Sequence, residues 1–270
     1  MMSREVKRMI YGKLPIILLS AMASEADGSK ECLIAHYILS HRREAANMSI
    51  VALAERCHVS VSSISRFCRA LGLSDFAELR ALIRRADWHY EPASRAPSPE
   101  QRVADTLGLL YASLDRAASS VDMKAIDILC RKIDAYERVA LFGLLKAGTA
   151  AQCLQADLLL QDKVTVCKLP LSQQMEYMER ADERDLILIF SYSGIYFDYL
   201  SQRMPEGLQR AHVVFITGAQ GVTSPCIDQL IRFDSDLSQA SHPLQMQLMA
   251  ALIAQEYAHL RRNREGVSRI

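Results

Sequence analysis

One stretch of the sequence, Ser49–Leu73, limits the fold of this chain more than any other. It holds two runs of apolar residues at i, i+3, i+4 and i+7, the spacing that puts side chains on one helix face. The first run spans residues 50–57 and the second spans residues 64–71. Ser49 and Ser60 stand just before these runs, where a side-chain oxygen can cap free backbone N–H groups. We therefore expect two short helices joined by a tight turn.

The outward face of the second helix is expected to be polar and to carry no carboxylate. It offers hydroxyl and guanidinium groups, from Ser62, Ser63, Ser65, Arg66 and Arg69. Short hydrogen-bond donors near a helix N-terminus, followed by cations, suit a helix that enters the major groove of DNA. With the two capping serines added, the predicted DNA-binding residues are Ser49, Ser60, Ser62, Ser63, Ser65, Arg66 and Arg69. A solvated helical pair in an ordinary bundle is the alternative that spacing alone leaves open.

Charge is distributed unevenly along a chain whose net charge is only +1. Residues 1–90 hold 13 Lys and Arg against 9 Asp and Glu, a net charge of +4. The rest of the chain holds 19 against 22, a net charge of −3. A mildly basic part followed by a mildly acidic part suits a DNA-contacting module joined to a second domain.

Further helices are expected on both sides of Ser49–Leu73. Apolar spacing predicts a helix over residues 1–26, either continuous or broken at Pro15, and another over Ser29–Ser40. Ser74 is the expected N-cap of a helix that follows the stretch. The N-terminal part is therefore expected to be all-α.

A change of composition marks the end of this helical part. Residues 91–100 hold three prolines among small polar residues, and proline fixes φ and lacks a backbone N–H. We therefore expect a helical domain over residues 1–88, a proline-rich linker over 89–101, a second domain over 102–262 and a tail over 263–270.

The second domain is expected to be α/β. Short apolar runs alternate with helical patterns, and continuous apolar runs are typical of parallel strands covered on both faces. Such alternation predicts a five-stranded parallel sheet flanked by helices, with strands over residues 138–143, 164–169, 185–190, 212–217 and 229–233. One of the intervening helices is predicted over Ile195–Met204.

Ligands of open parallel sheets bind beyond the carboxyl ends of the strands, so the turns there deserve scrutiny. Two turns carry suitable chemistry, GLLKAGT at residues 143–149 and SYSG at residues 191–194. Backbone N–H groups at such turns can hold an anion. The predicted ligand-binding residues are Gly143, Lys146, Gly148, Thr149, Ser191, Ser193 and Gly194. An alternative is purely structural, with Ser193 capping a helix and Gly194 easing the turn.

The stretch LAERCHVSVSSISRFCRALGLSDFAEL resembles the N-terminal helix-turn-helix of RpiR-type bacterial transcription regulators. That motif has a Leu-Ala pair, a Val-Ser turn, a Ser/Thr-x-x-Arg-Phe-Cys helix, then Leu-Gly and Phe. The matching positions are Leu53, Ala54, Val59, Ser60, Ser63, Arg66, Phe67, Cys68, Leu71, Gly72 and Phe76. The second half resembles the sugar isomerase (SIS) domain that these regulators carry, including its SxSG turn at residues 191–194.

This resemblance implies a cytoplasmic, non-enzymatic regulator that binds a double-stranded DNA operator. It also implies a homodimer or homotetramer, no cofactor, and an SIS domain that senses a sugar phosphate or a related anionic metabolite. No Cys/His cluster has the spacing of a metal site, and the longest apolar run near the N-terminus is too short to cross a membrane.

The chain departs from the family pattern at the phosphate-binding turns. Leu145 stands where the second Gly is usual, Ala147 where a Ser is usual, and Tyr196 where a Thr is usual. Each lost charge-assisted hydrogen bond would cost roughly 1.5–3 kcal/mol. Two alternatives follow. In the first, the SIS domain only dimerises or binds a different ligand. In the second, the chain is a sugar-phosphate isomerase, which would need a base such as Glu176, Glu179 or His242.

Overall fold

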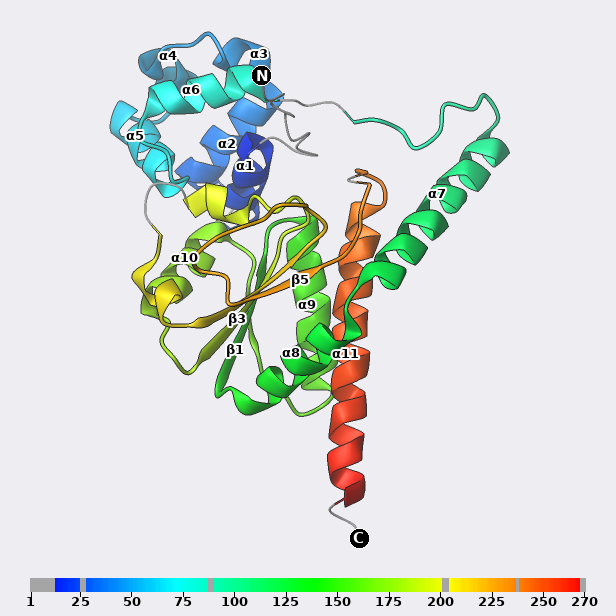
Figure 1. Ribbon diagram of the computed structural model, residues 1–270. Coiled ribbons are helices and arrows are strands. Elements are labelled where there is room, and N and C mark those ends of the chain that lie inside the picture. The colour runs from blue at the N-terminus through cyan, green and yellow to red at the C-terminus, as the bar shows by residue number, and fades with distance from the viewer. Residues whose placement is uncertain (1–12, 25–27, 87–89, 201–203, 237, 268–270) are drawn as a thin grey trace, which may run out of the picture.

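The computed structural model describes residues 13–24, 28–86, 90–200, 204–236 and 238–267. Its N-terminal part is all-α (Figure 1). The helices in this part are α1 (Lys13–Ser24), α2 (Lys30–Ser40), α3 (Arg42–Ala45), α4 (Ile50–Arg56), α5 (Val61–Ala70) and α6 (Phe76–Arg85). Ser49–Leu73 forms α4, a tight turn and α5, as predicted.

Serine side chains begin the helices of this part where the sequence placed them. The Ser49 hydroxyl accepts from the Ala52 N–H at 3.1 Å, and the Ser60 hydroxyl accepts from the Ser63 N–H at 3.2 Å. The prediction of Ser74 as the cap of α6 was wrong. The Asp75 carboxylate accepts from the Glu78 N–H at 2.9 Å instead, because a carboxylate one residue later reaches the same free donors.

The remaining described helices and strands alternate, as predicted. They are α7 (Pro99–Ser120), α8 (Met123–Ala135), β1 (Arg138–Gly143), α9 (Lys146–Leu159), β2 (Val166–Lys168), α10 (Leu171–Arg180), β3 (Asp185–Phe190), η1 (Tyr196–Leu200), η2 (Glu206–Gln209), β4 (His212–Thr217), β5 (Gln229–Arg232) and α11 (His242–Val267). The five-stranded sheet is parallel throughout and has the strand order β2-β1-β3-β4-β5. This confirms the predicted fold class.

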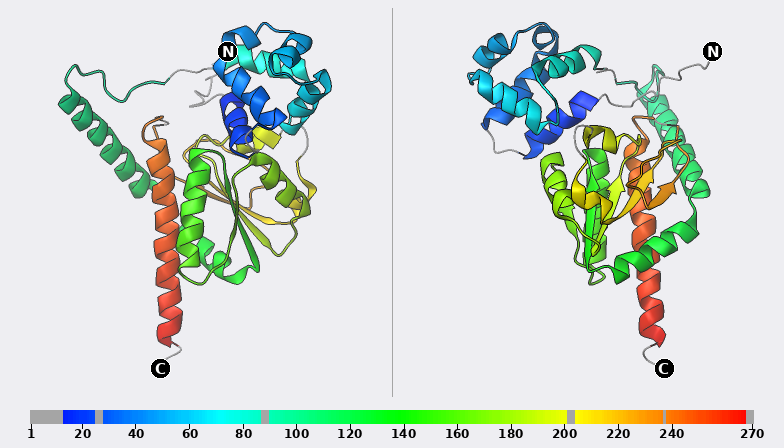
Figure 2. Two further views of the ribbon diagram at one scale, coloured as in Figure 1. Left: turned by 180° about the vertical axis from the view of Figure 1, so that it is seen from behind. Right: turned by 60° about the vertical axis from the view of Figure 1, so that its left-hand side comes forward.

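Helices cover both faces of the sheet (Figure 1). One face packs against α8, α9 and α11. The other face packs against α10 and the 3-10 helices, and the N-terminal helices lie at the carboxyl end of the sheet (Figure 2). Because β1 and β3 are neighbours and lead to opposite sides, their carboxyl ends form the switch point where such folds bind ligands.

Two element predictions need correction. Within the helix expected over Ile195–Met204, the described residues form a short 3-10 helix, η1, because the turn before it is held by Gly194 at a φ of +73° and the Tyr196 ring is buried. Residues 201–203 of that prediction lie outside the described residues. The helix expected over residues 1–26 is described only as α1. Pro15 does not break it, because proline is tolerated in the first turn; residues 1–12 and 25–27 of that prediction lie outside the described residues.

Helix α1 joins the two parts of the molecule. Its apolar side chains Leu14, Ile17 and Leu18 are buried in the same continuous core that contains the sheet residues Phe142 and Ile189. Its Ser20 hydroxyl also accepts a hydrogen bond from the backbone N–H at the start of α10. A helix of the N-terminal part is therefore packed directly over the carboxyl end of the sheet.

Candidate functional site

The first candidate surface is the outer face of α5. Ser62, Arg66 and Arg69 are exposed, and Ser65 is half-buried. The helix has no carboxylate, and the opposite face buries Ile64, Phe67 and Cys68. Hydrogen bonds to the preceding turn steady two of the polar side chains: the Ser65 hydroxyl donates to Val61 O at 3.2 Å and Arg66 Nε donates to Ser62 O at 3.4 Å. The face is therefore a small cationic surface open to a partner.

Ser63 does not lie on this face, contrary to the expectation. It is buried, and its hydroxyl lies 2.9 Å from the Ser60 hydroxyl, which is also 2.8 Å from that of Ser62. The reason is geometric, because Ser63 lies one turn before the core residue Phe67 and therefore shares its side of the helix. Ser60 and Ser63 thus stabilise the start of α5, and the exposed polar set is smaller than predicted.

The helix pair is held in place by arginines of α6. Arg84 Nε donates to Ala46 O at 2.8 Å, and Arg80 Nη1 approaches Met48 O at 3.5 Å. Both carbonyls belong to the segment that leads into α4. These arginines therefore fix the chain just before Ser49, the exposed N-cap of α4.

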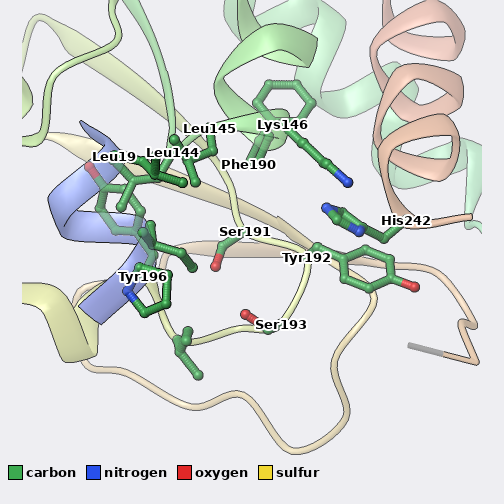
Figure 3. Close-up of a pocket in the computed structure, with 14 residues that line it drawn as sticks. Leu19, Leu144, Leu145, Lys146, Phe190, Ser191, Tyr192, Ser193, Tyr196 and His242 are labelled. Carbon is green, nitrogen blue, oxygen red and sulfur yellow. The ribbon is translucent and has the colours of Figure 1, made fainter. Parts of the chain in front are cut away.

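The second candidate site is a cavity at the carboxyl ends of β1 and β3, roofed by α1 (Figure 3). It has a volume of about 170 Å³. Most of its lining is hydrocarbon, including three residues of α1; the lining residues are Pro15, Ile16, Leu19, Leu144, Leu145, Lys146, Ala147, Phe190, Ser191, Tyr192, Ser193, Ile195, Tyr196 and His242. The cavity thus lies at the switch point and includes a wall that comes from the N-terminal helical part.

The predicted ligand-binding residues divide between this cavity and the packing around it. Lys146, Ser191 and Ser193 line the cavity. The other four, Gly143, Gly148, Thr149 and Gly194, are not among its lining residues. Three of the seven predicted residues therefore line this cavity and four do not.

Glycine at these other positions allows close packing. A Cβ at Gly143 would lie 2.8 Å from the backbone carbon of Ala147, and one at Gly148 would lie 2.9 Å from Gly143 O. Helix α9 can therefore pack tightly onto β1. Thr149 is exposed, and its hydroxyl donates to Leu145 O at 3.3 Å.

Leu145, which stands where the family pattern has a Gly, has an unusual backbone conformation. It has φ 51° and ψ −120°, a conformation that favours glycine and costs other residues about 1–3 kcal/mol. The turn between β1 and α9 thus keeps a glycine-like backbone while a leucine side chain lines the cavity (Figure 3). The sequence showed the substitution but could not show the strain.

Tyr196 closes the inner end of the cavity. It is buried, and its hydroxyl donates to the side-chain oxygen of Gln174. The Gln174 amide in turn donates to Gly143 O at 2.8 Å and Lys168 O at 2.7 Å. Burial raises the pKa of the Tyr196 hydroxyl. A neutral, hydrogen-bonded tyrosine therefore occupies the position where the sequence comparison expected a small hydroxyl residue.

The cationic end of the cavity is formed by Lys146 and His242, which point toward one another (Figure 3). Burial, together with the charge of Lys146, lowers the pKa of His242 to about 4. The His242 ring also packs against Tyr192 with a centroid distance of 4.7 Å. At neutral pH this end therefore carries a cationic lysine beside a neutral histidine.

Residues 18–87 match the model of a helix-turn-helix domain, rpiR family. The chain carries an rpiR-family helix-turn-helix domain. The match contains all of α2 to α6 and the part of α1 that follows residue 17, so it includes the polar face of α5. It contains the whole of Ser49–Leu73.

Similarity to other proteins extends beyond this domain. The HTH-type transcriptional regulator HexR of Pseudomonas aeruginosa is 28% identical over 245 residues, which is 82% of this chain and 81% of that protein. The structure of the Vibrio vulnificus NanR protein complexed with ManNAc-6P aligns with 94% of this chain and 97% of that chain, at 17% identity and a TM-score of 0.49. The sugar isomerase domain of the RpiR transcription factor from Sphaerobacter thermophilus aligns with 63% of this chain and 99% of that chain, at 14% identity and a TM-score of 0.44.

The chain is therefore similar to transcription regulators both over its helix-turn-helix domain and, in the case of HexR, over most of its length. Among the described residues, no helix is both long and apolar enough to cross a membrane. The part of the chain that the structure describes also contains no group of three side chains that could hold a metal ion.

Proposed function

We propose that this regulator reads a two-fold DNA operator with the outer face of α5. The observation that carries the proposal is the exposed set of Ser62, Arg66 and Arg69 on a helix without carboxylates. Guanidinium groups bind guanine edges bidentately and also neutralise phosphates, and short hydroxyls near a helix start reach bases or backbone. The exposed Ser49, at the start of α4, is suited to a phosphate contact.

A two-fold operator requires at least two copies of the chain, so the proposal includes a homodimer, or a homotetramer built from dimers. Helix α7 supports it, because this helix projects from the α/β domain (Figure 1). Its outer face carries Val103, Leu107 and Tyr111 at a spacing of one helical turn, and the Tyr111 side chain is 70% exposed. An apolar face of this kind is suited to pack on a second copy.

The dimer has its own test, which is sedimentation equilibrium of the full chain. We expect a dimer, and we expect Leu107→Glu to shift it toward monomer. Ile128→Glu is the matched control, because Ile128 is a similarly exposed aliphatic residue on α8. Dissociation by the control alone would move the interface away from α7.

The α/β domain is proposed to sense a small anionic metabolite in the cavity rather than to catalyse a reaction. The lining residues that the structure describes include no Asp or Glu, so no carboxylate base faces the cavity. Glu176 is exposed and pairs with Arg180 at 2.8 Å, and Glu179 is also exposed on α10. His242 lines the cavity, but no carboxylate of the lining can orient it.

Selection from a random pool of duplex DNA tests the reading role. We expect an enriched two-fold motif whose half-sites lie about one helical turn of DNA apart, on the order of 34–36 Å. A pool that shows no enriched sequence after several rounds, with folded protein confirmed by circular dichroism, would overturn the proposal.

A further inference from the structure

We propose that the cavity beneath α1 binds a small monocarboxylate with a compact apolar body, such as a simple aromatic acid. The proposal deepens the sensing role given above and rests on it. It concerns the chemical class of the ligand, which the sequence resemblance left as a sugar phosphate or a related anion. Size, lining, charge and backbone geometry of the cavity each support it.

The size and the lining favour a compact apolar body. A volume of about 170 Å³ is close to that of apolar cavities that hold a benzene ring, which are about 150 Å³. Pro15, Ile16 and Leu19 form the roof, and Leu144 and Leu145 form the adjoining wall. Sugar hydroxyls placed against these side chains would lose their hydrogen bonds to water without gaining others.

The turn after β1 no longer offers a phosphate cradle. Phosphate-binding turns use glycine so that the ligand can approach the backbone closely. Here Leu145 adopts the glycine-like conformation and its side chain lines the cavity. At the inner end, the buried Tyr196 ring is held by its hydrogen bond to Gln174 and stands where the family pattern has a small hydroxyl residue.

The charge of the cavity matches one negative charge. Lys146 is the cation among the described lining residues, and His242 beside it is kept neutral at pH 7 by burial and by that lysine. The hydroxyls of Ser191 and Ser193 also line the cavity and can donate to a carboxylate. A monocarboxylate is therefore matched in charge and in donors, with its body toward α1.

This orientation places the apolar body of the ligand against α1, in the N-terminal helical part that contains α5. Ile16 and Leu19 belong to α1, whose other side packs into the core shared with α2 and α6. The C-terminal half of α5 also reaches this junction, because Phe67, Ala70 and Leu71 line a smaller cavity with residues of α1 and α10. An occupant of the cavity therefore contacts the helix that supports α5.

Calorimetric titration of the full-length chain tests the ligand class with three probes: benzoate, benzyl alcohol of nearly the same size, and the larger glucose 6-phosphate. We expect benzoate to bind and to raise the melting temperature. Benzyl alcohol, which keeps the ring but lacks the charge, is expected to bind at least tenfold more weakly. Tighter binding of glucose 6-phosphate than of benzoate would overturn the proposal. It would also be overturned if none of the three probes bound.

Variants locate the binding in the cavity. Lys146→Met should weaken benzoate binding at least tenfold, and Leu19→Trp should abolish it by filling the space under α1. The matched control is Leu33→Trp, because Leu33 is a comparably exposed leucine on α2 and does not line the cavity. Unchanged benzoate affinity in Leu19→Trp would overturn the location.

A second variant keeps the test decisive if Leu19→Trp does not fold. Leu145→Gly preserves the backbone conformation and removes the apolar branch, so benzoate should bind more weakly and inorganic phosphate more tightly than in the wild type. The reverse pattern would overturn the proposal. Selection from a DNA pool tests operator binding separately from ligand binding. An enriched motif together with no benzoate binding would overturn the ligand proposal and leave the operator proposal intact.

Discussion

The outer face of α5 and the cavity beneath α1 differ in almost every property that governs recognition. The α5 face is open to water and carries Arg66 and Arg69, with the short hydroxyls of Ser62 and Ser65 nearer the helix start. The cavity is mostly hydrocarbon, with Lys146 and the neutral His242 at one end. Exposed cations suit an extended polyanion, whereas a mostly apolar cavity suits one small charge on an apolar body. The two proposed anion sites would thus select by different means.

The largest expected effect is a loss of folding stability at acid pH, which tests how well water is excluded from around His242. The pKa of His242 is lowered to about 4 in the folded chain by burial and by Lys146, against an ordinary value of 6.5. The unfolded chain therefore binds more protons between these values, so stability is full above pH 6.5 and falls as the pH drops toward 4. The loss attributable to this residue is up to about 3 kcal/mol.

Urea unfolding at pH 7 and pH 4.5 measures this loss. His242→Gln should lose less stability on acidification than the wild type does. His259→Gln is the control, because His259 is exposed on α11 and its removal should leave the acid dependence unchanged. Equal acid dependence in wild type and His242→Gln would mean that the cavity end is well hydrated.

The second prediction concerns operator binding by the outer face of α5. Arg66→Ala should weaken binding to the selected operator by about 2 kcal/mol, or roughly thirtyfold, because a guanidinium contact to a base edge is lost. The measurement is fluorescence anisotropy at fixed salt. Arg116→Ala, an exposed arginine on α7, removes the same charge and should change affinity little. Equal loss in both variants would indicate a general charge effect rather than reading by α5.

The third effect tests whether the hydroxyl cluster at the start of α5 is structural. Ser60→Ala should lower the free energy of unfolding by about 1 kcal/mol, because the cap to the Ser63 N–H is lost. Ser65→Ala is the control, since its hydroxyl only bonds back to the preceding turn. A stability change that is larger for Ser65→Ala than for Ser60→Ala in thermal unfolding would contradict this assignment.

The smallest effect separates packing from binding at the turn after β1. Thr149→Ala should change stability by less than about 0.5 kcal/mol and should leave benzoate affinity unchanged, because the side chain is exposed and bonds to Leu145 O. Calorimetric titration next to Lys146→Met gives the contrast. A loss of affinity in Thr149→Ala would extend the cavity beyond its lining residues.

The sequence was sufficient for most of the fold because the decisive patterns are local. The continuous apolar runs of β1, β3 and β4 gave their bounds, and the alternation of strands and helices gave a parallel sheet. The pair α4 and α5 followed from apolar spacing and serine caps. Ser63 was misplaced because it lies one turn before the core residue Phe67 and so shares the buried side of α5, where its hydroxyl meets that of Ser60.

The cavity could be predicted only in part, because its character depends on contacts distant in the sequence. The turns after β1 and β3 pointed to the right end of the sheet, and Lys146, Ser191 and Ser193 do line the cavity. Its roof comes from α1, more than a hundred residues away, and no local pattern connects the two. The strained backbone at Leu145 and the Tyr196–Gln174 hydrogen bond are likewise tertiary features.

The central claim is that α1 couples ligand binding in the cavity to DNA binding by α5. Operator affinity measured by anisotropy during a benzoate titration tests this most directly. We predict that saturating benzoate changes the operator Kd of the wild type by at least about fivefold, the lower end of ordinary coupling between sites, and does not change that of Lys146→Met. Benzoate that binds the wild type but leaves its operator Kd unchanged would contradict the claim.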